Sequence, residues 1–405
     1  MKQSLLLPIY VCLFCLQAIV ARAEPQPKGA TADSIRISLL TCAAGGEIYS
    51  LFGHTAIRYE NPARGIDAVF NYGLFDFDAP NFILRFALGE TDYQLGASNY
   101  ERFAAEYHYL GRDVWQQTLN LTSEEKERLV ALLEENYRPE NRIYRYNFFY
   151  DNCATRPRDR IERAIDGTLL YADDMTDEHT GVTFRDLLHK YSEGHLWTRF
   201  GMDLCMGSEA DKSISRRQMM FIPFYVQEYF SRAQIADKQG RTRPLVARET
   251  KIVVTGKTPA DFLTGGITPM QAALLLLAFT ATVSYFGIRR GKTLWGIDLL
   301  LFLVAGTAGC IPAFLAGFSQ HPAVSPNYLL FVLHPLHLFC LPFMLFRVRK
   351  GKMSRYMLAN FIVLTLFILL WAVIPQRIPP AVLPLALCLL IRSASNLILT
   401  YKRKP

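Results

Sequence analysis

Five apolar segments in the C-terminal third of the chain constrain its fold more than any other feature. Each is close to the ~20 residues that an α-helix needs to cross the hydrocarbon core of a bilayer. Most charged residues of this part of the chain lie in short clusters between the segments. We therefore predict an all-α transmembrane domain of about five helices within residues 263–405. The segments are 269–287, 294–317, 328–347, 356–374 and 381–400.

Basic residues between these segments predict the orientation of the block. Lys and Arg cluster after the first, third and fifth segments, whereas the loops 318–327 and 375–380 hold only Arg377. Loops rich in Lys and Arg stay in the cytoplasm. The first helix therefore enters from outside, and the residues before it lie outside the cytoplasm. The clusters are Arg289, Arg290, Lys292, Arg347, Arg349, Lys350, Lys352, Arg355, Lys402, Arg403 and Lys404.

The N-terminus predicts export independently. Lys2 precedes an apolar run over residues 5–20, and Ala21 and Ala23 are small residues at the two positions that signal peptidase reads. We predict a signal peptide over residues 1–23, with an uncleaved first helix as the alternative. Either alternative exports the segment that begins at residue 24. The chain is therefore expected to be a multi-pass protein of the bacterial inner membrane with its N-terminal domain in the periplasm.

Composition narrows the class of the exported part. Residues 24–262 mix charged and apolar residues as a soluble domain does, whereas most of the formal net charge of +8 comes from loops of the membrane block. We therefore predict no nucleic-acid binding. The sequence carries no zinc-ribbon or phosphate-loop motif, so we predict neither a metal nor a cofactor.

The exported segment predicts an α+β domain with a small antiparallel sheet. Alternating apolar residues predict strands, of which the second and third form a hairpin. Thr122 and Glu125 form a capping box that starts a helix ending near Tyr137. Another helical stretch comes after Asn152 and ends near Gly167. The predicted strands are 35–41, 52–60, 66–72, 114–121 and 144–150, and two further short helices are 81–88 and 100–107.

Cys153 is the most interesting of three cysteines that remain in the exported segment, the others being Cys42 and Cys205. It comes after a strand and precedes a helix. A thiol at a helix N-terminus beside arginines is expected to have a lowered pKa. Pro157 leaves open a helix that begins later, which weakens this effect. A structural or disulfide-bonded role for Cys153 also stays open.

His54 is the best candidate for a base that accepts the proton of such a thiol. It lies on a predicted strand beside Gly53, which lets another chain or a substrate approach closely. A purely structural role for a strand histidine remains an alternative. The other histidines of the exported segment are His108, which lies among tyrosines, and His179, His189 and His195, which lie in polar segments.

In this chain a histidine lies on an early strand, a second strand comes next, and Asn-Cys then precedes a helix. This order resembles that of a circularly permuted papain-like fold. Lecithin retinol acyltransferases and permuted relatives of NlpC-type peptidases share this order, and the resemblance covers residues 35–167. The whole chain resembles the Lnb-type family of Bacteroides-like bacteria, which is associated with lipoprotein N-acylation. The segments that carry this resemblance are 52–56, 71–73, 148–155, 183–185, 197–203 and 319–322.

The resemblance implies that Cys153 is the nucleophile and His54 the base. A polar side chain on the next strand would orient the imidazole, and we predict Asn71, although a shift of one residue in strand register would place Tyr72 there. Candidate substrate-binding residues are Glu47, Tyr72, Asp151, Asn152, Arg156 and His321, with loop hydrogen bonding as the alternative role. Arg156, Arg158 and Arg160 would either meet a lipid phosphate or form a solvated face.

The function implied by the resemblance is acyl transfer from a phospholipid, through a thioester on Cys153, to the N-terminal amine of a diacylated lipoprotein. One alternative is an envelope cysteine hydrolase of the same fold that cleaves peptidoglycan or protein amides. Another is a non-catalytic envelope-assembly module, in which Cys153 pairs with Cys42 or Cys205. Polar residues of the membrane segments would mark a functional path or bond helices together. They are His334, His337, Arg392, Ser395 and Asn396.

Overall fold

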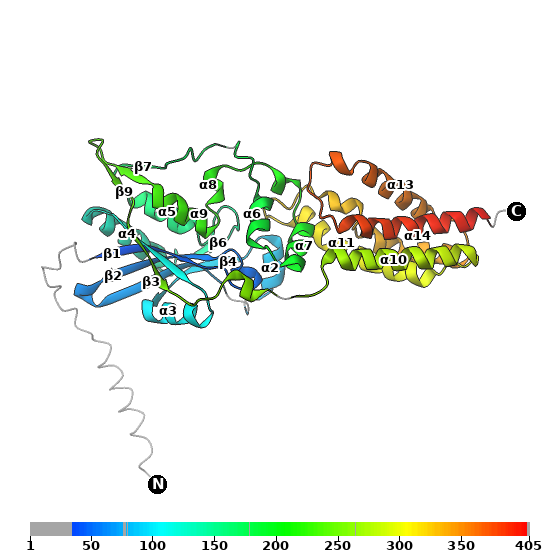
Figure 1. Cartoon of the computed structure of the whole chain (residues 1–405), viewed down its shortest axis with the longest axis horizontal. Coiled ribbons are helices and arrows are strands. Elements are labelled where there is room, and N and C mark those ends of the chain that lie inside the picture. The colour runs from blue at the N-terminus through cyan, green and yellow to red at the C-terminus, as the bar shows by residue number, and fades with distance from the viewer. Residues whose placement is uncertain (1–34, 76–77, 79, 178, 264, 403–405) are drawn as a thin grey trace, which may run out of the picture.

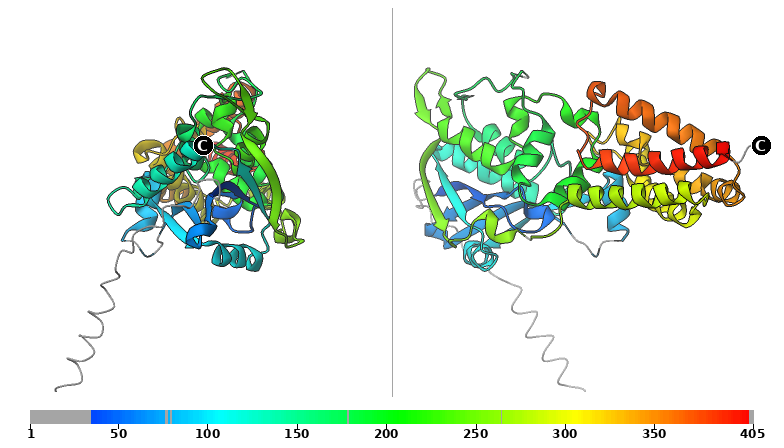
Figure 2. Two further views of the ribbon diagram at one scale, coloured as in Figure 1. Left: turned by 90° about the vertical axis from the view of Figure 1, so that its left-hand side faces the viewer. Right: turned by 45° about the vertical axis from the view of Figure 1, so that its right-hand side comes forward.

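The structure is a computed structural model that describes residues 35–75, 78, 80–177, 179–263 and 265–402. The predicted signal peptide lies outside these residues. The chain forms two parts along one long axis, an α+β domain at one end and a bundle of apolar helices at the other (Figures 1 and 2).

A seven-stranded antiparallel sheet in the order β10-β5-β1-β2-β3-β4-β6 forms the centre of the α+β domain. The predicted hairpin of the second and third strands is confirmed. The predicted strand over 144–150 is wrong beyond Arg145, where the chain turns. The strands are β1 (Arg36–Cys42), β2 (His54–Asn61), β3 (Ile66–Leu74), β4 (Asp92–Asn99), β5 (Val114–Leu119), β6 (Ile143–Arg145) and β10 (Val246–Val253).

Helices cover both faces of this sheet. Alternate side chains of β1 and β2 point to opposite faces. Ile37, Leu39 and Ile57 pack with α4, α5 and α9, whereas Leu40 and Ala56 pack with α3. The helices are α3 (Tyr100–Tyr109), α4 (Ser123–Tyr137), α5 (Thr155–Ala164) and α9 (Pro223–Arg232), and a three-stranded sheet of β7 (Thr168–Leu170), β8 (Gln234–Ala236) and β9 (Thr242–Pro244) lies apart.

The predicted start of α4 is confirmed. The Glu125 N–H donates to the Thr122 hydroxyl, and the Thr122 N–H donates to the Glu125 carboxylate. Glu125 also accepts from Arg243, which lies in β9. The capping pair therefore fixes the start of α4 and, through Arg243, joins this helix to β9.

One end of the sheet faces the membrane helices. β1 and β3 end there, and β2 and β4 begin there, because neighbouring strands run antiparallel. The short helix α2 (Phe82–Leu88) comes after β3 at this end and contacts α11 of the membrane block. Any site at these strand ends therefore lies between the sheet and the bilayer.

Four segments of the C-terminal part are long and apolar enough to cross a membrane. A fifth apolar helix, α13 (Arg355–Leu369), is shorter, so the fifth span stays a prediction. The four are α10 (Pro269–Arg289), α11 (Trp295–Phe318), Tyr328–Arg349, which includes α12 (Leu336–Arg349), and α14 (Val382–Lys402).

The two loops that are predicted to lie outside the cytoplasm contact the α+β domain. Asn327 donates to the Leu204 carbonyl oxygen at 2.9 Å, and Gln376 donates to the Met206 carbonyl oxygen at 2.9 Å. Arg377 forms an ion pair with Asp186. We call these contacts the junction. They agree with the orientation predicted from the basic clusters.

A buried charged residue, Arg185, precedes Asp186 in the sequence and supports the junction. Arg185 is fully buried and bonds to Asp203 at 2.6 Å and to Asp211 at 2.7 Å. Its two carboxylate partners satisfy a guanidinium that would otherwise be costly to bury. Segments 183–185 and 197–203, which carry part of the family resemblance, thus lie where the two parts of the chain meet.

Within the membrane block, Arg392 of α14 joins three elements. Its Nε lies 2.6 Å from Asp298 Oδ1 on α11, and its Nη1 donates to Ser284 on α10 at 3.0 Å. Both charged side chains are buried. Of the two roles left open for Arg392, these contacts favour helix–helix bonding.

Replacing Arg392 by Met should destabilise the membrane block by about 3–5 kcal/mol, because Asp298 is left buried without a partner. The double variant Arg392→Met/Asp298→Leu should recover most of this loss. The measurement is the fraction of detergent-solubilised protein that stays monodisperse on heating. A double variant as unstable as the single one would contradict this assignment.

Candidate active site

Cys153 lies in a tight loop just before α5, which begins at Thr155. Asn152 holds this loop with four hydrogen bonds. Its Oδ1 accepts from the N–H groups of Ala154 and Thr155, and its Nδ2 donates to the carbonyl oxygens of Phe148 and Phe221. Asn152 is buried, so its role in the structure is to fix the loop that presents the thiol.

The sulfur of Cys153 meets the sheet where β2 begins. The main-chain N–H groups of Cys153 itself and of Thr55, the residue after His54, lie close enough to the sulfur to lower the pKa of the thiol. Gly73 of β3 also comes close, since a Cβ placed on it would lie 3.4 Å from the Cys153 Cβ. Gly73 has φ = +90° at an irregularity of the β3–β4 pairing, and such irregularities often occur beside active sites.

His54 and Asn71 lie on neighbouring strands and bond to each other. In the β2–β3 register Asn71 pairs with Ala56, so its side chain lies on the same face as that of His54. The His54 Nε2 lies 3.1 Å from the Asn71 Oδ1. Because this oxygen can only accept, the proton is on Nε2 and Nδ1 is the basic nitrogen. Tyr72 points to the opposite face and donates to Asn136, so the register does not place Tyr72 beside the imidazole.

Burial keeps both groups neutral at pH 7. It raises the pKa of Cys153 to about 11, against the weaker opposing effects of the Thr55 N–H and the Arg112 charge. Burial, together with the weaker effect of the Arg112 charge, lowers the pKa of His54 to about 4. The predicted lowering of the thiol pKa is therefore wrong. The cysteine precedes the helix N-cap, Ala154, and desolvation outweighs the helix dipole.

Arg112 is the residue that the sequence did not reveal. It is only 8% exposed, and its Nε donates to the Ala43 carbonyl oxygen at 2.7 Å. Its Nη2 is buried without a hydrogen-bond partner, and no described carboxylate forms an ion pair with it. Its charge acts on Cys42, His54 and Cys153. The guanidinium also lies 4.9 Å from the centroid of the Tyr107 ring, so this buried cation has an aromatic neighbour but no ion pair among the described residues.

Three tyrosines surround the thiol on its other side. Tyr93, Tyr144 and Tyr146 are all close enough for the charge of Cys153 to act on them. The rings of Tyr93 and Tyr146 stack with centroids 4.1 Å apart. Together they form an aromatic wall that contributes to the desolvation of Cys153.

The remaining candidate residues lie outside this constellation or fix its loop. Glu47 is exposed. Asp151 and Arg156 form an ion pair, and the Arg156 guanidinium lies 3.5 Å from the centroid of the Tyr144 ring. His321 bonds through Nε2 to the Phe86 carbonyl oxygen of α2 at 2.6 Å. Arg158 is buried rather than solvated.

The described cysteines are all free thiols. The disulfide expected for a non-catalytic module, from Cys153 to Cys42 or Cys205, is therefore not formed. Cys42 is fully buried, and burial raises its pKa to about 12, whereas Cys153 keeps some accessible surface. Of these two thiols at the strand ends, only Cys153 is open to a substrate.

The fold and this arrangement define a membrane-attached protein whose α+β domain presents a cysteine, a histidine and an asparagine at strand ends facing the bilayer. Residues 25–190 match the family model of the Lnb N-terminal periplasmic domain, and residues 261–404 match that of the Lnb transmembrane domain. The chain thus belongs to the Lnb-type family. No curated protein and no solved structure matches it.

The raised thiol pKa predicts how Cys153 reacts with iodoacetamide. Only the thiolate reacts, so the alkylation rate should rise about tenfold per pH unit from about pH 7 to pH 10. Mass spectrometry of the Cys153 peptide measures this rate, and the Cys205→Ser variant removes a competing thiol. A rate that is already constant at about pH 7 would instead indicate a preformed thiolate–imidazolium pair.

Proposed function

We propose that this protein is an inner-membrane lipoprotein N-acyltransferase that moves an acyl chain from a phospholipid to the N-terminal amine of a diacylated lipoprotein. The two family matches support a periplasmic domain that acts in a lipoprotein context. The observation that supports the proposal is that the main chain of Thr55 acts on the Cys153 thiol, while His54, the residue before Thr55, bonds to Asn71.

In the first half-reaction, Nδ1 of His54 takes the Cys153 proton as the sulfur attacks an ester carbonyl carbon of the phospholipid. The tetrahedral intermediate then breaks its carbon–oxygen ester bond. The leaving alkoxide takes the proton from His54, so that a lysophospholipid leaves and an acyl thioester remains on Cys153. The imidazole is neutral at pH 7, so its Nδ1 is free to accept the proton, although burial also makes it a weaker base.

In the second half-reaction, the lipoprotein amine attacks the thioester carbonyl carbon. The carbon–sulfur bond breaks, the amine nitrogen loses a proton to His54, and the sulfur regains a proton from it. The products are an N-acylated lipoprotein and the original thiol. A thiolate is a good leaving group toward an amine, which favours a cysteine over a serine in this role.

In this proposal Arg112 and two main-chain N–H groups stabilise the negative charge that forms in both steps. The N–H groups of Thr55 and Cys153 already point at the sulfur. The Nη2 of Arg112 has no partner among the described residues. In the proposed reaction this guanidinium faces the carbonyl oxygen as it becomes an oxyanion, where preorganised donors have their largest effect.

The Cys153→Ser variant should lose acyl transfer by at least about a thousandfold, because the thioester cannot form. Incubation with a phospholipid labelled in its acyl chain and a diacylated lipopeptide, followed by mass spectrometry of the peptide, measures transfer. Cys205→Ser is the matched control and should transfer normally. Normal N-acylation by Cys153→Ser would end the proposal. Label released as free fatty acid, with none on the amine, would identify a hydrolase instead.

The Arg112→Met variant should lower the rate of transfer by about 10²–10³-fold if its charge stabilises the oxyanion. Removing the charge should also slow iodoacetamide alkylation of Cys153 at fixed pH, because Arg112 lowers the pKa of that thiol. Arg112→Lys keeps the charge and should retain more of both. If Arg112→Met matches the wild type in both measurements, Arg112 has no part in the reaction.

A further inference from the structure

The helix α2 exposes large apolar side chains, whereas a helix that faces water usually exposes polar ones. Ile83 is 83% exposed and Leu84 52% exposed, and Phe86 is exposed beside them. All three lie within two turns of one short helix. A contiguous apolar surface of this kind marks contact with a protein, a ligand or a membrane.

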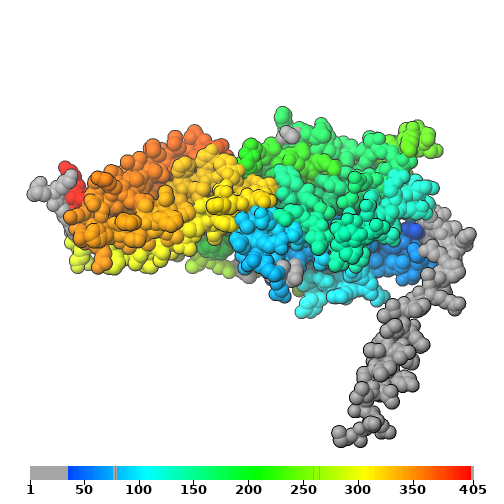
Figure 3. Space-filling view, turned by 180° about the vertical axis from the view of Figure 1, so that it is seen from behind, coloured from blue at the N-terminus to red at the C-terminus, as the bar shows by residue number. Residues whose placement is uncertain are grey.

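Hydrogen bonds fix α2 to the outer end of α11. The Gln320 N–H donates to the Leu88 carbonyl oxygen at 2.8 Å, and His321 bonds to the Phe86 carbonyl oxygen. The rings of Phe86 and His321 also contact, with centroids 5.6 Å apart. The space-filling view shows the blue segment that includes α2 against the yellow outer end of the membrane block (Figure 3). The helix therefore lies at the level of the periplasmic leaflet.

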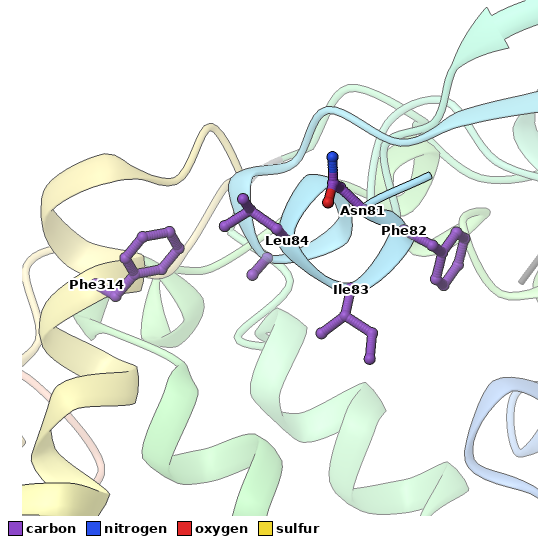
Figure 4. Close-up of a pocket in the computed structure, with 6 residues that line it drawn as sticks. Asn81, Phe82, Ile83, Leu84 and Phe314 are labelled. Atoms are coloured by element: carbon purple, nitrogen blue, oxygen red, sulfur yellow. The ribbon is translucent and has the colours of Figure 1, made fainter. Parts of the chain in front are cut away.

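An open groove of about 620 Å³ lies between α2 and α11. Leu84 points from α2 toward Phe314 of α11, and Ile83 points away from the helix axis on an adjacent side (Figure 4). The volume is within the range of small-molecule sites. The lining residues are Asn81, Phe82, Ile83, Leu84, Ala87 and Phe314.

A series of ring contacts leads from this groove to the thiol. Phe82 stacks on Phe86 on one side and on Phe75 on the other, with centroids 6.2 Å and 5.8 Å apart. Phe75 contacts Tyr93 at 5.1 Å, and Tyr93 stacks on Tyr146. These two tyrosines belong to the aromatic wall around Cys153. Packed aromatic rings thus connect the groove to the site.

We propose that the groove between α2 and α11 binds one acyl chain of a phospholipid from the periplasmic leaflet and guides its ester along the aromatic rings to Cys153. The proposal deepens the proposed function and rests on it. A lipid chain is favoured over a peptide because the groove continues the surface of α11, where Ile311 and Phe318 are exposed at membrane level. Among the described residues, its lining contains one polar side chain, Asn81, and no charged one.

The test uses the full-length protein in phospholipid nanodiscs with a phospholipid that carries a diazirine in one acyl chain. Photocrosslinking is done on the Cys153→Ser protein, so that binding is measured without the thiol. The crosslinks should map to α2 and the outer end of α11. Adding Leu84→Asp should reduce them about tenfold, because a charge replaces a leucine that contacts the chain.

Leu170→Asp is the matched control, since Leu170 is 44% exposed and lies on β7 far from the membrane block (Figure 1). With the thiol present, Leu84→Asp should raise KM for the phospholipid about tenfold and leave alkylation of Cys153 unchanged. Ile83→Asp provides a second variant, whose side chain is too exposed to affect folding.

The outcomes separate the two proposals. If both Asp variants crosslink like Leu170→Asp, or if crosslinks map to a neighbouring protein or peptide instead of lipid, the acyl-chain site is wrong. If the crosslinks map to α2 but Cys153→Ser still transfers acyl groups, the binding site stands and the proposed chemistry fails. If Cys153→Ser is inactive and Leu84→Asp keeps its KM and its crosslinks, only the binding site fails.

Discussion

The contact between the Cys153 sulfur and the Thr55 N–H is the interaction on which the site depends. It brings the loop before α5 onto the first residues of β2, and it requires a close approach by β3 that Gly73 permits. Asn152 fixes the loop from behind through four hydrogen bonds. Without these bonds the loop that carries the thiol would not be fixed, and the hydrogen bond between His54 and Asn71 would orient an imidazole that has no thiol held near it.

Burial then decides the protonation state of the site. Cys153 and His54 are both neutral at pH 7, because the aromatic wall and the sheet remove water from them. A neutral thiol is a weak nucleophile, so in the proposed reaction proton transfer to His54 accompanies the attack on the substrate. This arrangement has a chemical advantage in an exported protein, since a thiol with a high pKa is less prone to oxidation than an exposed thiolate. Arg112 lies close enough to lower both pKa values without creating an ion pair in the resting site.

Local signals predicted much of this architecture. The capping box at Thr122 and the alternation that predicts β1 to β3 each specify structure within a few residues, and these predictions were confirmed. Arg112 was missed because it sits in a Gly-Arg-Asp turn that looks like a solvated loop, and only the fold buries it against Ala43. The lowered pKa of Cys153 was wrong for a related reason. Helix dipoles can be read from nearby sequence, whereas desolvation depends on Tyr93 and Tyr146, whose positions around the thiol are set by the tertiary fold.

The membrane block is more than an anchor for this site. An anchor alone would require one apolar helix and a linker, but here α11 supplies Phe314 to the groove and the loop after it bonds to α2. Gln376 and Arg377 form a second set of contacts with the α+β domain, at the junction. Contacts at two places fix the domain on the membrane block, so that the loop carrying Cys153 is held in a set position relative to that block. Such fixed placement has a clear physical benefit when both substrates are confined to the periplasmic leaflet, because it removes much of the entropy cost of bringing them to one sulfur atom. A hydrolase acting on a substrate outside the bilayer would gain nothing from it.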